Sequence, residues 1–293
     1  MQKLLFTTLL TGLVLLHGIV RADVLQPYVL AWQGVAPLQT VVDNSKSSLQ
    51  GVGFELIGHY QPKPDTHVLV VTAPLLRQMV VTERNAAYLA AQSVAIQRVG
   101  DKVSVSYRNP DFYRVAYRMK GDVGPLRQAF LASLGRTRLF GSDEGLTESR
   151  LARFQYGYGL EHFDDQMTLG EFEDHRTALQ AIEKGFVRHN SLIDRVYRLD
   201  IPEVSVSIFG VAVLAGKGRD SHVHDLLDPP DLSHAAQLPY EVVVRNGKVR
   251  ALHPRFRMAL NFPDLKTLGR KGKLLLEAPD GIAAVLRALA NGH

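Results

Sequence analysis

The segment 220–234 has the highest density of potential metal ligands in the chain. Its histidines are His222, His224 and His234, and aspartates stand between them. On an extended strand, His222 and His224 would point to the same side, and His253, which follows the next hairpin, is a further candidate ligand. Imidazole and carboxylate together favour zinc, copper or nickel, so a divalent metal is one cofactor that the sequence allows. The alternative is a polar surface loop, because 228–231 has the sequence of a turn.

Five residues on the segments after two expected hairpins form a candidate anion site. They are Arg114, Arg118, Arg255, Arg257 and Asn261. Arg114 and Arg118 would share one face of a helix over 111–119. If these segments meet, four guanidinium groups would line one cleft and bind a carboxylate or phosphate group. The favoured alternative is that each arginine pairs with a nearby acid, such as Glu161 or Asp164.

A third candidate is the aromatic segment 156–165. Tyr156, Tyr158 and His162 could contact a ligand, and His162 beside neighbouring carboxylates could act as a general base. The alternative is an aromatic plug that seals two domains. We favour this alternative over catalysis, because aromatic side chains in a connecting segment usually serve packing.

Motifs of established enzyme classes are absent. The chain has no nucleophile elbow, no phosphate-binding loop with Lys-Ser/Thr, no His-Glu-x-x-His sequence and no full dinucleotide fingerprint. It also has no cysteine, which excludes disulfides, cysteine metal sites and thiol catalysis. No reaction can therefore be identified from motifs.

Two hairpins with similar turns indicate that the chain contains a repeat. The first covers 94–105 and turns at Gly100-Asp101, and the second covers 240–251 and turns at Asn246-Gly247. Asn-Gly favours a type I′ turn, whose central residues both need positive φ. Similar strand and helix patterns precede both hairpins at an offset of roughly 145 residues.

The predicted fold class is α+β, with two diverged α-β-β-α-β-β-α repeats related by a pseudo-twofold axis. Mainly antiparallel sheets would be covered by helices. We expect four segments: a signal peptide over 1–22, a first repeat over 23–135, a connector with a short helix and an aromatic cluster over 136–171, and a second repeat over 172–293.

The repeat resembles a known family at its hairpins. Tyr107-Arg108-Asn109-Pro110 follows the first hairpin and Leu252-His253-Pro254 follows the second. With the order of elements, these sequences resemble a tandem of the small α/β domain called family 302 of the domains of unknown function. The resemblance implies a fold and no chemistry.

The first 22 residues predict export. One lysine precedes an apolar run over 4–20, and small or aliphatic residues precede a cleavage site before Asp23. We therefore expect a periplasmic or secreted protein, with no transmembrane span once this segment is removed. The net charge of +5 is weak and contains no run of five like charges, which argues against nucleic acid as a partner.

Three functions are consistent with these features. The leading one is a non-catalytic exported protein that binds a small ligand, either an anion or an amphiphile, at the junction of the two repeats. The second is a metal-dependent hydrolase that uses the His/Asp-rich segment. The third is an envelope scaffold that binds a protein partner through an exposed hairpin edge. The sequence names neither the ligand nor a protein partner.

Overall fold

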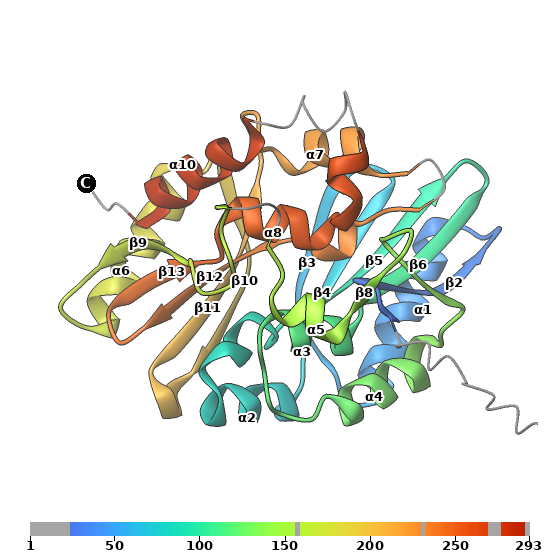
Figure 1. Cartoon of the computed structure of the whole chain (residues 1–293), viewed down its shortest axis with the longest axis horizontal. Coiled ribbons are helices and arrows are strands. Elements are labelled where there is room, and N and C mark those ends of the chain that lie inside the picture. The colour runs from blue at the N-terminus through green and yellow to red at the C-terminus, as the bar shows by residue number, and fades with distance from the viewer. Residues whose placement is uncertain (1–23, 156–158, 230–231, 269–276, 291–293) are drawn as a thin grey trace, which may run out of the picture.

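The computed structural model describes residues 24–155, 159–229, 232–268 and 277–290. These residues form an α+β protein with antiparallel sheets of six and five strands, packed with helices (Figure 1). The predicted fold class is confirmed at this level. The expected signal peptide lies outside the described residues.

The first sheet has the strand order β3-β4-β5-β6-β2-β7. Its strands are β2 (Tyr28–Gly34), β3 (Glu55–Lys63), β4 (Thr66–Thr72), β5 (Gln92–Val99), β6 (Lys102–Arg108) and β7 (Arg138–Phe140). The helices of this half are α1 (Leu38–Gly51), α2 (Pro74–Thr82), the 3-10 helix η1 (Arg84–Tyr88), α3 (Pro110–Ala116) and α4 (Gly124–Leu134).

The second sheet has the strand order β10-β11-β12-β13-β9. Its strands are β9 (Met167–Glu171), β10 (Ile193–Ile201), β11 (Val206–Val213), β12 (Tyr240–Arg245) and β13 (Lys248–Ala251). The helices of this half are α6 (His175–Arg188), η2 (Pro202–Val204), α7 (Asp220–Leu227), η3 (Ala235–Gln237), α8 (Pro254–Asn261), η4 (Pro263–Leu268) and α10 (Ala278–Ala290). Between the halves, β1 (Val24–Leu25) pairs with β8 (Leu146–Thr147), and α5 (Glu148–Ala152) follows.

Local sequence signals explain where several of these elements begin and turn. Asn246 and Gly247 both have positive φ between β12 and β13, as the Asn-Gly turn requires. The side chains of Asn109, Thr147 and Asp174 accept hydrogen bonds from backbone N–H groups at the first turns of α3, α5 and α6. Both predicted hairpins are confirmed, and the short helix expected in the connector is α5, with Thr147 as its N-cap.

The structure corrects three local predictions. Each half begins with a strand, β2 or β9, that the predicted order of elements lacked, and β7 and β9 lie in the segment expected to be a connector. The segment expected to be extended or looped around His222 is the helix α7. The helix predicted over 111–119 ends at Ala116, and Arg118 beyond it has a φ of 53°.

The two halves contact each other along edge strands β3 and β10 (Figure 1). A Cβ atom on Gly58 of β3 would lie 2.9 Å from the backbone oxygen of Val196 on β10, so this approach requires glycine. Helix α2 of the first half also contacts β10, and α7 of the second half contacts β3. Each half therefore packs a helix against the sheet of the other half. Among the described helices, none has the length and apolar character that a membrane span requires.

Candidate functional site

One face of the β12–β13 hairpin carries a row of cations. Side chains alternate between the two faces of a strand, so Arg245 lies on the same face as Lys248, its cross-strand partner. Arg250 lies two residues further along β13 and therefore shares this face. Helix α6 packs on these strands, and η1 of the other half contacts β12. The hairpin thus presents three basic side chains on one face.

A cavity of about 280 Å³, which we call the basic pocket, lies between η1 and this hairpin. It is lined by Arg84, Asn85, Ala87, Tyr88, Gln166, Val243, Arg245, Asn246, Lys248 and Arg250. The lining contains three arginines and one lysine but no carboxylate. Because the lining comes from both halves and from the segment before β9, the pocket exists only in the assembled fold.

Two guanidinium nitrogens of this pocket are buried without hydrogen-bond partners among the described residues. Nη2 of Arg245 and Nε of Arg250 are buried and have no hydrogen-bond partner. Within the described parts of the chain, no ion pair links Arg84, Arg245 or Arg250 to an acid. Lys248 Nζ lies 3.8 Å from Glu171 Oε1, but both side chains are more than half exposed. Buried polar groups are almost always hydrogen-bonded in folded proteins, so these two nitrogen atoms require an explanation.

Electrostatics at Arg245 also favours an anion. Burial lowers the pKa of its guanidinium, and the nearby positive charge of Arg84 lowers this pKa further, whereas Tyr88 raises it. A lowered pKa in a cation means that its surroundings disfavour the charged form. A negative group in the pocket would reverse this penalty.

Hydrogen bonds hold the first-half wall of the pocket in place. The Tyr88 hydroxyl donates to Gln166 Oε1 at 3.1 Å, and Asn85 Nδ2 donates to the carbonyl of Tyr117 at 3.0 Å. Both Tyr88 and Tyr117 are buried. The η1 wall is therefore fixed by contacts that leave the cations of the hairpin free.

A second group of arginines lies deeper between the halves, and here the charges are paired. We call Arg108, Glu241 and Arg257 the junction cluster. Arg108 Nη1 donates to Glu241 Oε1 at 2.8 Å, and Arg257 Nε donates to Glu241 Oε2 at 3.4 Å. All three side chains are at most 5% exposed. Arg108 also lies over the ring of Tyr113, and Arg257 over the ring of Tyr240.

The predicted anion cleft is not assembled as expected. Arg114 pairs with Glu148, Arg118 pairs with Asp164, and Arg255 pairs with both Glu161 and Asp280. The side chains of these three arginines are partly exposed. Each of them pairs with an acid, as the alternative interpretation of the sequence predicts. The remaining two candidates, Arg257 and Asn261, are buried at the junction.

Asn261 accepts hydrogen bonds through its Oδ1 from the hydroxyl groups of Tyr28 and Tyr113, at 3.2 and 2.5 Å. Its Nδ2 donates to the carbonyl of Arg257 at 2.6 Å. The amide therefore joins α8 of the second half to two tyrosines of the first half.

The aromatic connector is only partly described. Tyr156 and Tyr158 lie outside the described residues. His162 is half-buried; its backbone N–H donates to Asp165 Oδ2 at 2.8 Å, and its buried Nδ1 has no hydrogen-bond partner. Phe163 stacks on Tyr117 with ring centres 5.4 Å apart, and its edge also contacts the second half. The packing role expected for this segment is confirmed at Phe163.

The four histidines considered for metal binding are placed as follows. On helix α7, His222 and His224 are two residues apart, so their directions differ by about 200°. His224 is buried and its Nδ1 lies 3.1 Å from Asp228, while His234 Nδ1 lies 3.3 Å from the same carboxylate. His253 instead caps α8, and its Nε2 lies 3.4 Å from Glu161. The helix therefore removes the expected same-side arrangement of His222 and His224.

A search of the described residues finds no group of three or more His, Asp or Glu side chains placed to hold a metal ion. Asp228 instead joins His224 to His234 and accepts from the Ser233 hydroxyl at 2.7 Å. Burial would raise the pKa of Asp228, but the charges and hydrogen bonds of these two histidines outweigh burial and lower it well below its usual range. The carboxylate consequently stays ionised and orients both rings.

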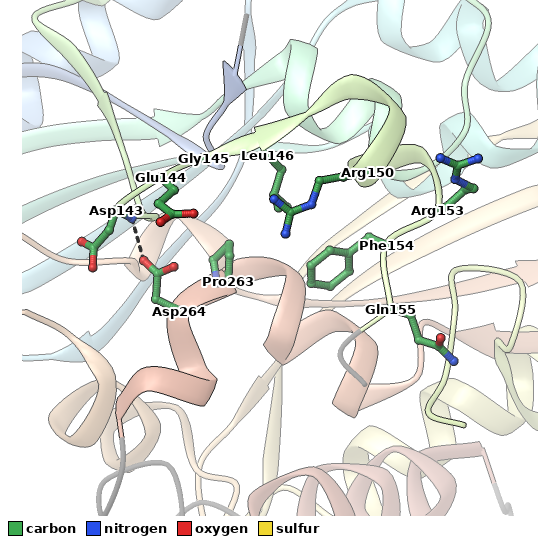
Figure 2. Close-up of a pocket in the computed structure, with 10 residues that line it drawn as sticks. All are labelled: Asp143, Glu144, Gly145, Leu146, Arg150, Arg153, Phe154, Gln155, Pro263 and Asp264. Atoms are coloured by element: carbon green, nitrogen blue, oxygen red, sulfur yellow. Dashed lines mark hydrogen bonds between the residues drawn. The ribbon is translucent and has the colours of Figure 1, made fainter. Parts of the chain in front are cut away.

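A further cavity, of about 580 Å³, lies beside the connector (Figure 2). Asp143, Glu144 and Asp264 lie on one side of it, and Arg150 lies on the other. Asp264 already accepts a hydrogen bond from the backbone N–H of Asp143 at 2.7 Å. The lining of this cavity carries charges of both signs, and Arg150 and Glu144 are exposed to water. Its charges are therefore better balanced and solvated than those of the basic pocket, which makes it a weaker candidate for an anion site.

Comparison with known proteins gives no relative. No family model matches the chain, and neither does any curated protein or solved structure. The resemblance to family 302 therefore stays a prediction, and the function has to be argued from the site itself.

Sequence reasoning missed the residues of the basic pocket. The Asn-Gly turn fixes the register that places Arg245 opposite Lys248, so the sequence held a signal for these two residues. Nothing local could indicate that Arg84 of the other half would line the same cavity or that no carboxylate would line it.

Proposed function

We propose that this protein binds a small oxyanion with two or more negative charges, of the phosphate or polycarboxylate class, in the basic pocket. The observation that carries the proposal is the pair of buried guanidinium nitrogens without partners, Arg245 Nη2 and Arg250 Nε, in a cavity that has no carboxylate. Phosphate and carboxylate oxygens match the planar donor array of arginine.

A purely structural role explains these side chains less well. Arg245 and Arg250 are half-buried and have no counter-charge among the described residues, whereas Arg108, which is fully buried, pairs with an acid in the junction cluster. Three arginines that share one cavity without an acid indicate that the counter-charge is a ligand. The volume of about 280 Å³ suits a small molecule.

We also infer that the two halves arose by duplication of one unit. Starting from an edge strand, the orders β3-β4-β5-β6-β2 and β10-β11-β12-β13-β9 place corresponding strands of each half in the same sequence. The predicted domain boundaries and pseudo-twofold axis rest on this inference. A binding site at the junction agrees with the tendency of pockets to form between domains.

The other two functions stay predictions. For a metal-dependent hydrolase, no observation brings three ligands together among the described residues. For an envelope scaffold, the feature in its favour is the set of exposed apolar side chains, such as Trp32. Export to the periplasm or outside the cell also stays a prediction, because it depends on residues 1–22.

The proposal is tested by isothermal titration calorimetry of the protein with pyrophosphate and with citrate at low ionic strength. We expect one site per chain, weakened at least about tenfold by Arg245→Gln or Arg250→Gln, because each change removes a charged donor from the pocket. Raising the salt concentration should weaken binding, since part of the attraction is screened.

Arg195→Gln is the matched control. Arg195 is a surface arginine that pairs with Glu183, and Glu183 keeps Arg198 as a partner after the change. Binding should be unchanged in this variant. Equal loss in all three variants, or no binding of either anion, would overturn the proposal.

A further inference from the structure

A second cavity, of about 470 Å³, is lined by a different set of residues from both halves and differs in chemistry from the basic pocket. We call it the aromatic pocket. Fourteen residues line it, among them Gln26, Phe140, Leu232, His234, Phe262 and Leu265. Each half supplies seven of them. Seven of the fourteen have apolar side chains, so the cavity can surround a ring or a short hydrocarbon group.

The ring of His234 is fixed in this pocket. Its backbone N–H donates to Asp228 Oδ1 at 3.0 Å, and its Nδ1 lies 3.3 Å from the same oxygen. The ring centre lies 4.7 Å from that of Phe262 and 5.1 Å from that of Tyr28. The Asp228 contact favours the tautomer with the proton on Nδ1, and in that tautomer the Nε2 atom is a hydrogen-bond acceptor. No described group donates to it.

A second acceptor without a partner belongs to the same lining. Gln26 Oε1 is buried and has no hydrogen-bond partner, although the backbone oxygen of Gln26 accepts from Asn109 Nδ2 at 2.9 Å. An unpaired buried acceptor costs free energy that a donor in the cavity would recover. The pocket thus combines apolar walls with two acceptors, His234 Nε2 and Gln26 Oε1.

The remaining charges favour a neutral or cationic ligand over an anion. Asp143 and Asp264 also line the cavity, against a single cation, Arg138. This balance is the reverse of the basic pocket, which has four cations and no acid.

We propose that the aromatic pocket is a second binding site, for a small aromatic molecule that carries a hydroxyl or amino group. The ring packs between Phe140, Phe262 and the two leucines, and the donor on the ring pairs with His234 Nε2 or Gln26 Oε1. This inference does not depend on anion binding in the basic pocket.

The test uses fluorine NMR of two nearly isosteric probes, 4-fluorophenol and 4-fluorotoluene, with the full chain. Replacement of the hydroxyl by a methyl group keeps the shape and removes the donor. We expect 4-fluorophenol to bind at least about tenfold more tightly than 4-fluorotoluene, because only the phenol can donate a hydrogen bond to the buried Gln26 Oε1 or to His234 Nε2.

Two variants place the binding in this pocket. Gln26→Leu should reduce the difference between the probes, because it removes one acceptor at similar volume. Leu265→Trp should fill the cavity and abolish the binding of both probes. Thermal unfolding checks that each variant is folded, and if one of them fails to fold, His234→Phe replaces it, since it keeps an aromatic ring without Nε2.

Arg250→Gln is the control, because it alters the basic pocket and leaves the aromatic pocket untouched. It should bind 4-fluorophenol as the wild type does. Equal affinity for the two probes, no binding of either, or phenol binding that survives both Gln26→Leu and Leu265→Trp would overturn the proposal.

Discussion

The junction cluster and the basic pocket both place several arginines between the halves, yet they differ in one respect. In the junction cluster, Glu241 lies between Arg108 and Arg257 and pairs with both. Buried guanidinium nitrogens without hydrogen-bond partners occur in both places, at Arg108 Nε as well as at Arg245 and Arg250, but no acid lines the cavity of the basic pocket. The comparison indicates that the first set holds the halves together, whereas the second set is available to a ligand.

The largest expected effect is on the junction cluster. Glu241→Gln removes the negative charge that pairs with both Arg108 and Arg257 and leaves these two buried cations without it. We expect the free energy of unfolding to fall by about 3–5 kcal/mol. Urea denaturation followed by circular dichroism measures this change.

Glu183→Gln is the control for this prediction, since Glu183 pairs with Arg195 and Arg198 on the surface. Its loss should cost about 1 kcal/mol or less. Similar costs for the two glutamates would contradict a special role for Glu241.

A second buried acid between the halves, Asp220, forms no ion pair with the described residues and should behave differently from Glu241. Its Oδ2 accepts from the Tyr60 hydroxyl of β3 and from the backbone N–H of Val213. Burial raises the pKa of Asp220 to about 6, although these hydrogen bonds lower it in part. Because the folded pKa lies above the unfolded value, its contribution to stability is full below pH 3.8 and is lost as the pH rises through about 6.

The measurement is the difference in unfolding free energy between the wild type and Asp220→Asn at pH 4.5 and pH 7. Asparagine keeps both acceptor contacts and does not titrate. We expect the variant to gain about 2 kcal/mol on the wild type between these pH values, which follows from a shift of roughly two pKa units. The other acids cancel in this difference, so a variant that tracks the wild type would contradict the raised pKa.

A substitution in the turn between β12 and β13 should disturb the basic pocket. Gly247 has a φ of 81°, and a Cβ atom there would lie 2.4 Å from the backbone oxygen of Phe172. We expect Gly247→Ala to cost about 1–3 kcal/mol of unfolding free energy and to weaken anion binding, because Arg245 and Lys248 flank the turn. Gly100→Ala is the control at the first hairpin: its φ is also positive, at 61°, but a Cβ atom there meets no neighbour within 4 Å. Gly100→Ala should lower the unfolding free energy less than Gly247→Ala does and leave anion binding intact.

The smallest expected change in unfolding free energy is opposite in sign to that of Glu241→Gln. Arg250→Gln removes one cation from a cluster that has no counter-charge, so the protein without a bound anion should be as stable as the wild type or more stable, by up to about 1 kcal/mol. Differential scanning calorimetry in a buffer without multivalent anions measures this. A loss of stability as large as that of Glu241→Gln would show that the two arginine sets do not differ in role.

The sequence by itself determined the parts of the fold that depend on neighbouring residues. Positive φ at Asn246 and Gly247 follows from the Asn-Gly pair, and the caps of α3 and α5 follow from Asn109 and Thr147, because turns and caps form within a few residues. The prediction of an extended or looped segment around His222 was wrong for a physical reason. The sequence around His222 and His224 fits both a polar loop and a helix, and in the structure it is the helix α7, which contacts the other half.

The candidate sites were decided by the tertiary structure. Arg114 and Arg245 look alike in sequence, but Glu148 neutralises the first and no acid reaches the second. Whether an arginine is paired depends on which side chains the assembled halves bring within a few ångströms, and residues up to roughly 160 positions apart, such as Arg84 and Arg245, contribute to one cavity. Charge pairing across such distances in sequence is set by packing, so it could be seen only once the two sheets were placed against each other.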